Sequence, residues 1–166
     1  KKTEISIENN KDKIIEKGNN EKQMVSFIVS DENTKNYLIN NNIPFDYLIK
    51  YEQFNPEAKY EQINNDTINF RKLNRKFNKY NLNSKICYLN DNIKTFCLKE
   101  KMYLVNSKLE LNNSNIIEVK KSITNGSIIY INDGTKQENI DLIIKEIKFK
   151  GLSIVYLSKL ISEQKD

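Results

Sequence analysis

Gly126-Ser-Ile-Ile-Tyr-Ile-Asn-Asp-Gly134 opens the stretch of sequence that decides the fold. Its β-branched run predicts a buried strand over 127–131. Thr135-Lys-Gln-Glu138 then has the form of a capping box, in which a hydroxyl and a carboxylate bind the first free N–H groups of a helix. The following helix has an i, i+3, i+4, i+7 core stripe, formed by Ile140, Ile143, Ile144 and Ile147. Gly151 is expected to end this helix and 153–157 predicts a final strand, so the stretch predicts a β-α-β unit.

The same alternation of strands and helices extends over the rest of the chain. Short apolar runs predict strands, over 23–30, 43–49, 85–89 and 102–106. Helical patterns lie between them, over 34–42, 57–80, 92–101 and 114–123, and the first is expected to be capped near Asp31 or Asn33. Continuous apolar strands are typical of a parallel sheet covered by helices, so we expect an open α/β sheet or an α/β barrel.

Polar residues follow the expected strands. In parallel α/β folds the functional side chains gather at the carboxyl ends of the strands. Those ends are occupied by five pairs of residues: Ser30-Asp31, Lys50-Tyr51, Leu89-Asn90, Asn106-Ser107 and Asn132-Asp133. We therefore expect the functional site among these residues.

Composition limits the chemistry that the chain can perform. The 166 residues include 27 Lys plus Arg, 22 Asp plus Glu and no His, for a formal net charge of +5. Every mechanism that uses an imidazole as a base, metal ligand or proton shuttle is thereby excluded. The basic residues are 25 Lys and only 2 Arg, scattered among acids, which favours a solvated surface and predicts no nucleic-acid partner.

The chain divides into a polar segment and one domain. Residues 1–21 are polar and lack periodicity, which predicts a tether, and residues 22–166 are enough for a domain with its own core. No apolar run is long enough to span a bilayer, and because the chain begins at Lys1 we expect an anchor or signal to have been removed upstream. Cys87 and Cys97 are either two buried free thiols or one disulfide, and the sequence leaves both open.

Several stretches match the motifs of a known family. Gly126–Gly134 is similar to G-S-I-I-L-L-H-D, and Lys150-Gly-Leu-Ser-Ile-Val-Tyr-Leu-Ser-Lys-Leu160 to K-G-Y-x-F-V-T-L-S-E-L. Val25-Ser-Phe-Ile-Val-Ser-Asp-Glu32 is similar to V-A-L-T-F-D-D-G, while Tyr51–Pro56 falls at H-[ST]-x-x-H-P and Ile86–Asp91 at F-R-P-P-Y-G. The chain thus resembles, over about 23–161, the polysaccharide deacetylase family, which is the NodB-homology domain or carbohydrate esterase family 4. The resemblance implies a distorted (β/α) barrel, here incomplete or shortened.

The resemblance also implies a metal-dependent site, but most of its positions hold other residues. Family members bind a divalent metal, often zinc, with one Asp and two His, and use a second Asp as base and another His as acid. The corresponding residues here are Ser30 (base), Asp31 (metal), Tyr51 and Asn55 (metal), Cys87 (the motif arginine) and Asn132 (acid), with Asp133 beside it. One carboxylate does not hold zinc against water, and an amide donates no proton near neutral pH. We therefore expect no metal, no other cofactor and no intact catalytic site.

The acids and aromatic residues that remain each have two interpretations. Asp31 and Asp133 are expected to cap helices or anchor turns, or else, with Glu110, to form a rebuilt Mg²⁺ or Ca²⁺ site. The second set lies where the family has its substrate groove, so it either binds a glycan or packs in the core: Tyr51, Phe54, Asn55 and Tyr88.

The leading hypothesis is a deacetylase-like domain without catalysis. It would bind a cell-envelope glycan such as peptidoglycan, or a protein partner such as an active deacetylase. The resemblance implies an extracellular or cell-envelope location, with membrane contact only through a removed N-terminal anchor. The abundance of 26 Asn and 24 Ile, which have A/T-rich codons, indicates a low-GC bacterium. The alternatives are an active metal-dependent carbohydrate deacetylase with a rebuilt carboxylate site, and a purely structural interaction protein.

Overall fold

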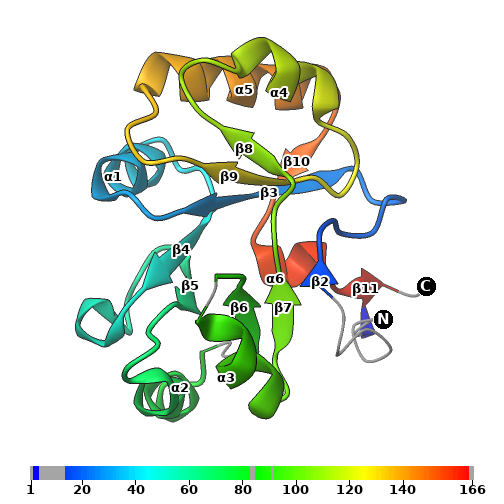
Figure 1. The fold of residues 1–166 in the computed structure, drawn as a ribbon. Helices are drawn as coiled ribbons and strands as arrows, with labels where there is room; N and C mark the ends of the chain where they lie inside the picture. Colours follow the sequence, from blue (N-terminus) through cyan, green and yellow to red (C-terminus); the bar gives the residue numbers. More distant parts are fainter. Residues whose placement is uncertain (1, 4–13, 83–84, 91, 165–166) are drawn as a thin grey trace.

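The structure is a computed structural model that describes residues 2–3, 14–82, 85–90 and 92–164. Residues 1 and 4–13 of the expected tether, and Asp91, lie outside the described residues. Strands and helices alternate along most of the chain, with most of the helices outside the strands (Figure 1). The elements are β1 (Lys2–Thr3), β2 (Ile14–Ile15), β3 (Met24–Val29), α1 (Glu32–Asn40), β4 (Asp46–Ile49), the 3-10 helix η2 (Tyr51–Gln53), β5 (Glu61–Asn64), α2 (Phe70–Lys79), β6 (Ile86–Tyr88), α3 (Ile93–Lys99), β7 (Tyr103–Val105), β8 (Leu109–Leu111), α4 (Ile116–Ser122), β9 (Ile128–Ile131), α5 (Gln137–Phe149), β10 (Ser153–Ile154), α6 (Leu157–Leu160) and β11 (Glu163–Gln164).

Two parallel sheets form the body of the fold. The larger has the order β5-β4-β3-β9-β8, with β10 also pairing with β3, and the smaller has the order β2-β7-β6. β5 lies next to β6, so the two sheets curve around one interior (Figure 1). Within the described residues, no hydrogen-bonded ladder joins β5 to β6 or β7 to β8. The expected α/β architecture with parallel strands is confirmed.

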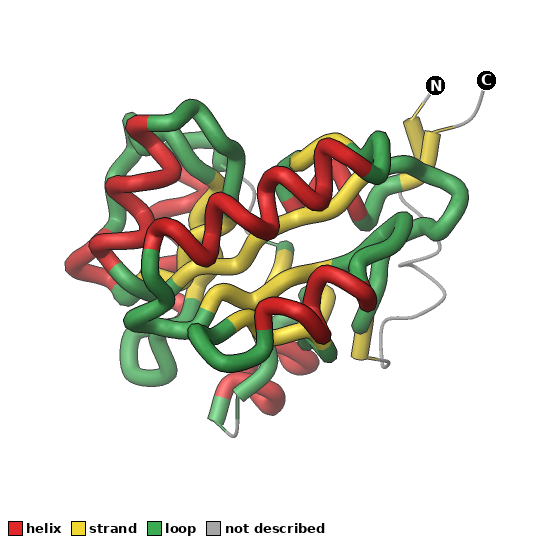
Figure 2. The backbone as a smooth tube through the Cα atoms, turned by 90° about the horizontal axis from the view of Figure 1, so that it is seen from above, coloured by secondary structure: helices red, strands yellow, loops and turns green. Residues whose placement is uncertain are grey.

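Side chains alternate between an outer and an inner core. On β3, Phe27 and Val29 lie in the outer core with α1, α4 and α5, and Ile28 lies in the inner core. α4 and α5 run beside each other over the strands (Figure 2). The inner core is closed by α6 through Leu157 and Leu160. Because both faces of the strands are buried, their sequences are continuous apolar runs rather than alternating ones.

Most elements of the expected β-α-β unit are confirmed. β9 covers the predicted strand, and the isoleucine stripe of α5 is buried. Gly151 ends α5 with φ +74°, the left-handed conformation that favours glycine. At the other end of the domain, the carboxylate of Asp31 accepts a hydrogen bond from the backbone N–H of Asn33 at 2.8 Å, so the expected cap of α1 is also confirmed.

The prediction of one long helix over 57–80 is wrong. The segment forms β5, a turn and then α2, because β5 pairs in parallel with β4 along its whole length. Asp66 separates the two elements, since its side chain accepts hydrogen bonds from the backbone of Ile68 and Asn69. Strand pairing thus overrides the helical spacing of apolar residues.

Two smaller predictions are also corrected. The strand expected over 153–157 is only Ser153–Ile154, because Leu157 begins α6. The capping box is wrong: α5 begins after Lys136 with no side-chain cap, and the Thr135 hydroxyl donates instead to the carbonyl of Asn132 at 2.6 Å. β8, only three residues long, has no counterpart among the predicted strands. It pairs in parallel with β9 and places Glu110 opposite Tyr130.

Part of the segment before residue 22 lies against the domain. β2 pairs in parallel with β7, and the N–H of Gly18 donates to the carbonyl of Gly126 at 2.8 Å. These contacts fix residues 14–18 beside the sheet, whereas a tether role for residues 1–21 stays a prediction. No helix among the described residues has the length and apolar character that crossing a membrane requires.

A buried carboxyl joins α6 to the larger sheet. Asp46, at the start of β4, is fully buried and its Oδ1 accepts the N–H of Leu157 at 2.8 Å. Its register partner Glu61 accepts the N–H of Ser158 at 2.9 Å, while Oδ2 of Asp46 has no hydrogen-bond partner among the described residues. Burial, and then the charge of Glu61, raise the pKa of Asp46 well above its usual value. Asp46 therefore binds a proton more tightly in the folded chain.

The first prediction concerns the close approach of Gly18 to Gly126. A Cβ added at Gly126 would lie 2.7 Å from the carbonyl oxygen of Gly18, and Gly126 has φ +84°. Gly134 has φ +82° but open space around it, so Gly134→Ala should cost only the roughly 1–2 kcal/mol of a left-handed alanine. Gly126→Ala should lower the free energy of unfolding by about 1–3 kcal/mol more than this control. Urea denaturation measures both, and equal losses would contradict the packing of this segment.

The second prediction concerns the pH dependence of stability. Because the folded pKa of Asp46 lies above the unfolded one, its stabilising contribution is complete below pH 3.8 and is lost as the pH rises through the folded pKa. Asp46→Asn resembles the protonated carboxyl at every pH. The difference in free energy of unfolding, variant minus wild type, should therefore increase by about 1.4 kcal/mol per pH unit between pH 3.8 and the folded pKa of Asp46.

Urea denaturation at a series of pH values measures this difference. Glu57→Gln is the matched control, because Glu57 is exposed and makes no side-chain contact with the described residues. A difference between Asp46→Asn and the wild type that does not change with pH would show that Asp46 is ionised in the folded chain.

Candidate functional site

A pocket opens at the carboxyl ends of the strands and reaches the inner core. Its volume is about 390 Å³. Side chains from β4, β5, β6, β7, β8 and β9, or from the residues directly after them, form its wall: Leu48, Asn65, Tyr88, Leu89, Asn90, Asn106, Glu110, Tyr130 and Asn132. This placement agrees with the expectation that the functional side chains gather at this end of a parallel fold.

Four asparagines give the pocket its polar character. Two of them bind each other, since Nδ2 of Asn90 donates to Oδ1 of Asn65 at 2.8 Å. Oδ1 of Asn90 also accepts the backbone N–H groups of Asn92 and Ile93 at 2.9 Å, so the start of α3 fixes this pair. The side chains of Asn106 and Asn132 make no hydrogen bond with the described residues, which leaves their donors and acceptors available to a ligand.

Two tyrosines form the aromatic wall. The ring centroids of Tyr88 and Tyr130 are 5.3 Å apart at an interplanar angle of 36°. The Tyr88 hydroxyl accepts the N–H of Ser107 at 3.0 Å, and the Tyr130 hydroxyl shares a hydrogen bond of 2.8 Å with Ser30. Burial raises the pKa of Tyr88 to about 12 and also raises the pKa of Tyr130. Both phenols are therefore neutral at physiological pH and offer a ring face and a hydroxyl.

The structure brings Ser30, Asp31 and Asp133 together at the ends of β3 and β9. The Ser30 hydroxyl donates to Oδ1 of Asp133 at 2.5 Å, and Oδ2 of Asp31 accepts the N–H of Gly134 at 2.9 Å. Its other oxygen, Oδ1, accepts the backbone N–H of Asn33, so the carboxylate of Asp31 binds two backbone donors. These contacts agree with the interpretation that Asp31 caps a helix and anchors a turn, whereas the Asp133 side chain bonds to Ser30 instead.

The residues present do not fit the metal that the sequence resemblance implies. Asp31 provides one carboxylate, but the neighbouring pocket adds mainly amides, which are poor zinc ligands. In the described part of the chain, no three His, Cys, Asp or Glu residues converge on one point, so the set of Asp31, Asp133 and Glu110 does not form the expected cluster. Glu110 lines the pocket alone as an exposed carboxylate.

Three of the four residues expected to bind a glycan lie elsewhere. Tyr88 lines the pocket, whereas Tyr51, Phe54 and Asn55 follow β4, and the first two lie against α2. Phe54 packs on Phe77 with ring centroids 5.5 Å apart. The backbone N–H of Tyr51 donates to Asp66, and that of Asn55 donates to Gln62. The motif placement at residues 51–56 therefore does not bring these residues into the pocket.

Cys87 is also outside the pocket. It alternates with Tyr88 on β6 and points to the opposite side, into a cluster with Cys97 and Met102 between β6 and α3. Both cysteines are free and buried, so of the two interpretations of this pair the free thiols are confirmed. A residue on this face is not placed to contact a ligand at the strand ends.

Asn65 is one of three pocket residues, with Leu48 and Tyr130, that the sequence prediction missed. Asn65 was not expected at a strand end, because the apolar residues of 57–80 have helical spacing and predicted one helix there. The available signal is the run Asn64-Asn-Asp66, whose short polar side chains bind nearby backbone groups and end a strand.

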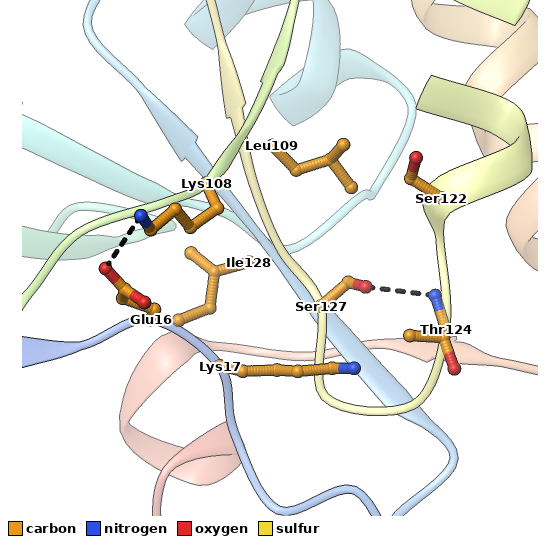
Figure 3. Close-up of a pocket in the computed structure, with 8 residues that line it drawn as sticks. All are labelled: Glu16, Lys17, Lys108, Leu109, Ser122, Thr124, Ser127 and Ile128. Atoms are coloured by element: carbon orange, nitrogen blue, oxygen red, sulfur yellow. Dashed lines mark hydrogen bonds and ion pairs between the residues drawn. The ribbon is translucent and has the colours of Figure 1, made fainter. Parts of the chain in front are cut away.

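A second pocket lies near the amino ends of β8 and β9 (Figure 3). Its volume is about 230 Å³, and its wall is formed by Glu16, Lys17, Lys108, Leu109, Ser122, Thr124, Ser127 and Ile128. Lys108 pairs with Glu16 at 3.4 Å, and the N–H of Thr124 donates to the Ser127 hydroxyl at 2.9 Å. Because several of its polar groups are already paired with each other, the pocket at the carboxyl ends is the stronger candidate.

Comparison with known proteins identifies the fold. No family model and no curated relative matches the sequence. Among solved structures, the wild-type CE4 family pseudoenzyme of Bacillus anthracis matches with a TM-score of 0.68 and 14% identity, over 92% of this chain and 70% of that chain. A mutant of that pseudoenzyme with restored enzymatic activity matches with a TM-score of 0.65 and 13% identity, over 92% and 72%. A peptidoglycan N-acetylglucosamine deacetylase matches with a TM-score of 0.65 and 15% identity, over 93% and 94%.

These likenesses extend over nearly the whole chain. They include a protein described as a deacetylase, a pseudoenzyme and its mutant with restored activity, so they identify an architecture that occurs with and without catalysis. The chain has the α/β fold of the NodB-type, or CE4, deacetylases, as the sequence motifs predict.

Proposed function

We propose that the chain is a polysaccharide deacetylase-like domain that binds a cell-envelope glycan without cleaving it. The observation that carries the proposal is the pocket at the carboxyl ends of the strands. Uncharged amides and phenols form most of its polar wall, and ionisable groups able to activate water are scarce there. One solved structure with the same fold is described as a peptidoglycan deacetylase and another as a pseudoenzyme, which supports this substrate class and this loss of activity.

The chemistry of the wall suits a sugar. Asn106 and Asn132 each provide an amide donor and an acceptor that no described residue uses, and Glu110 adds a carboxylate acceptor. Sugar hydroxyls and an N-acetyl group need such mixed donors and acceptors, and the face of a pyranose packs on an aromatic ring. Tyr88 and Tyr130 are held by Ser107 and Ser30, so the pocket is formed before the ligand binds.

The loss of catalysis follows from residue types at the strand ends. The family motif has two His four residues apart, and Asn65 and Asn69 have this spacing directly after β5, where Asn65 lines the pocket. We therefore place the two metal positions at Asn65 and Asn69, in preference to Tyr51 and Asn55. Ser30 then stands for the base and Asn132 for the acid, and neither side chain titrates near neutral pH.

The third prediction tests glycan binding. The purified chain should be retained on peptidoglycan and should bind N-acetylated chito-oligosaccharides in calorimetry, with no release of acetate. Asn132→Ala removes one uncommitted amide and should weaken binding by roughly 10-fold, because a hydrogen bond to a ligand contributes on the order of 1 kcal/mol.

Asn36→Ala is the matched control, since Asn36 is exposed on α1 with no side-chain partner among the described residues. Equal binding by the two variants, or no retention of the wild type at low salt, would contradict the proposal.

The fourth prediction tests the placement of the lost metal site. A variant with Ser30→Asp, Asn65→His and Asn69→His keeps Asp31 and should gain stoichiometric zinc binding, because catalytic zinc sites take three protein ligands of these types. The comparison variant carries Ser30→Asp, Tyr51→His and Asn55→His, and should gain none. Competition with a chromogenic chelator measures both, and far-UV circular dichroism verifies that each is folded. Zinc binding by the comparison variant alone would reverse the placement.

A further inference from the structure

The exposed side of α2 carries an unusual concentration of positive charge. Five of its ten residues are basic and none is acidic, and they include both arginines of the chain. The opposite side of the helix packs into the core through Phe70, Leu73 and Phe77. We define the basic face of α2 as the five basic residues of this helix: Arg71, Lys72, Arg75, Lys76 and Lys79.

Carboxylates neutralise little of this charge. Arg71 bonds through Nε to Glu100 at 3.2 Å, yet its side chain is still 56% exposed. The other four cations of the basic face form no ion pair with the described residues. Arg71 and Arg75, and likewise Lys72 and Lys76, are like charges four residues apart, an arrangement that destabilises a helix unless an anion lies beside it. The helix is therefore a favourable site for a negatively charged ligand.

Aromatic rings position the lysines of this face. The Nζ atoms of Lys72 and Lys76 lie over the ring of Tyr51, at 4.5 and 4.6 Å from its centroid. Lys76 also lies 5.5 Å from the ring of Phe54, and Lys79 lies 5.8 Å from that of Tyr80. These contacts restrict the lysine side chains while leaving their ammonium groups able to bind anions. They also occupy the ring faces on which nucleic-acid bases would stack.

We propose that the basic face of α2 binds a phosphodiester-linked polymer of sugars or sugar alcohols, which carries regular negative charges and no bases. A ten-residue helix is about 15 Å long, enough to meet several successive phosphates of such a chain. The two guanidinium groups match phosphate oxygens in pairs, and the lysines add point charges. This function goes beyond glycan binding, because none of the five cations lines the pocket at the strand ends.

The experiment measures binding of fluorescent poly(glycerol phosphate) by anisotropy at 50 and 200 mM salt. With four phosphates neutralised, the dissociation constant of the wild type should rise on the order of 50-fold over this range, by counterion release from a single-stranded polyanion. The variant Lys72→Gln, Arg75→Gln, Lys76→Gln, Lys79→Gln should lose at least 10-fold in affinity at 50 mM salt.

A charge-matched variant tests whether polymer binding depends on the basic face or only on the net charge of the chain. Lys121→Gln, Lys136→Gln, Lys145→Gln, Lys148→Gln removes the same charge from exposed positions elsewhere and should bind within 3-fold of the wild type. Equal losses in the two variants, no binding by the wild type, or binding of single-stranded DNA as tight as that of the polymer would overturn the proposal. Asn132→Ala should keep full polymer affinity, so failure of the glycan proposal remains distinguishable from failure of this one.

Discussion

The fold depends on the parallel pairing of β3, which changes partner along its length. On one side β3 pairs with β9; on the other, Ile28 and Val29 pair with β4, and Met24 and Val25 pair with β10. Asp46 starts β4, and Leu157 starts the helix after β10. The hydrogen bond from the N–H of Leu157 to Asp46 therefore links the two segments that pair with this side of β3. Parallel pairing also brings the carboxyl ends of β3, β4 and β9 to one edge, where Ser30, Asn132 and the pocket lie.

How much of this could be predicted depends on whether local sequence or distant pairing decides an element. α5 and β9 were predictable, since an isoleucine stripe and a β-branched run identify them without reference to the rest of the chain. β5 and β8 were not, because Glu61–Asn64 and Leu109–Leu111 become strands by pairing with β4 and β9. Because β5 was not predicted, Asn65 was not recognised as a residue at the end of a strand, and so it was left out of the expected site.

Under the proposed function, the candidate site is a scaffold whose geometry is kept without the chemistry of the family. Catalysis at strand ends needs groups that titrate or bind metals, whereas the position of those ends is set by the buried faces of the strands. An Asn or Ser at a strand end is compatible with an intact strand, and Ser30 at the end of β3 bonds to both Tyr130 and Asp133. The pocket remains concave and polar, so the property that survives most readily is recognition of the neutral groups of a ligand.

Charge is divided between the two proposed surfaces in a way that net charge does not reveal. Glu110 gives the pocket wall a negative group, while α2 carries five cations without an acid of its own. A neutral sugar chain thus fits the first surface and a polyanion the second, and neither ligand competes for the other's site. If both polymers belong to one matrix, binding at one surface raises the effective concentration of the second ligand. Two individually weak contacts would then hold the domain firmly, which is the binding role that we propose for this fold.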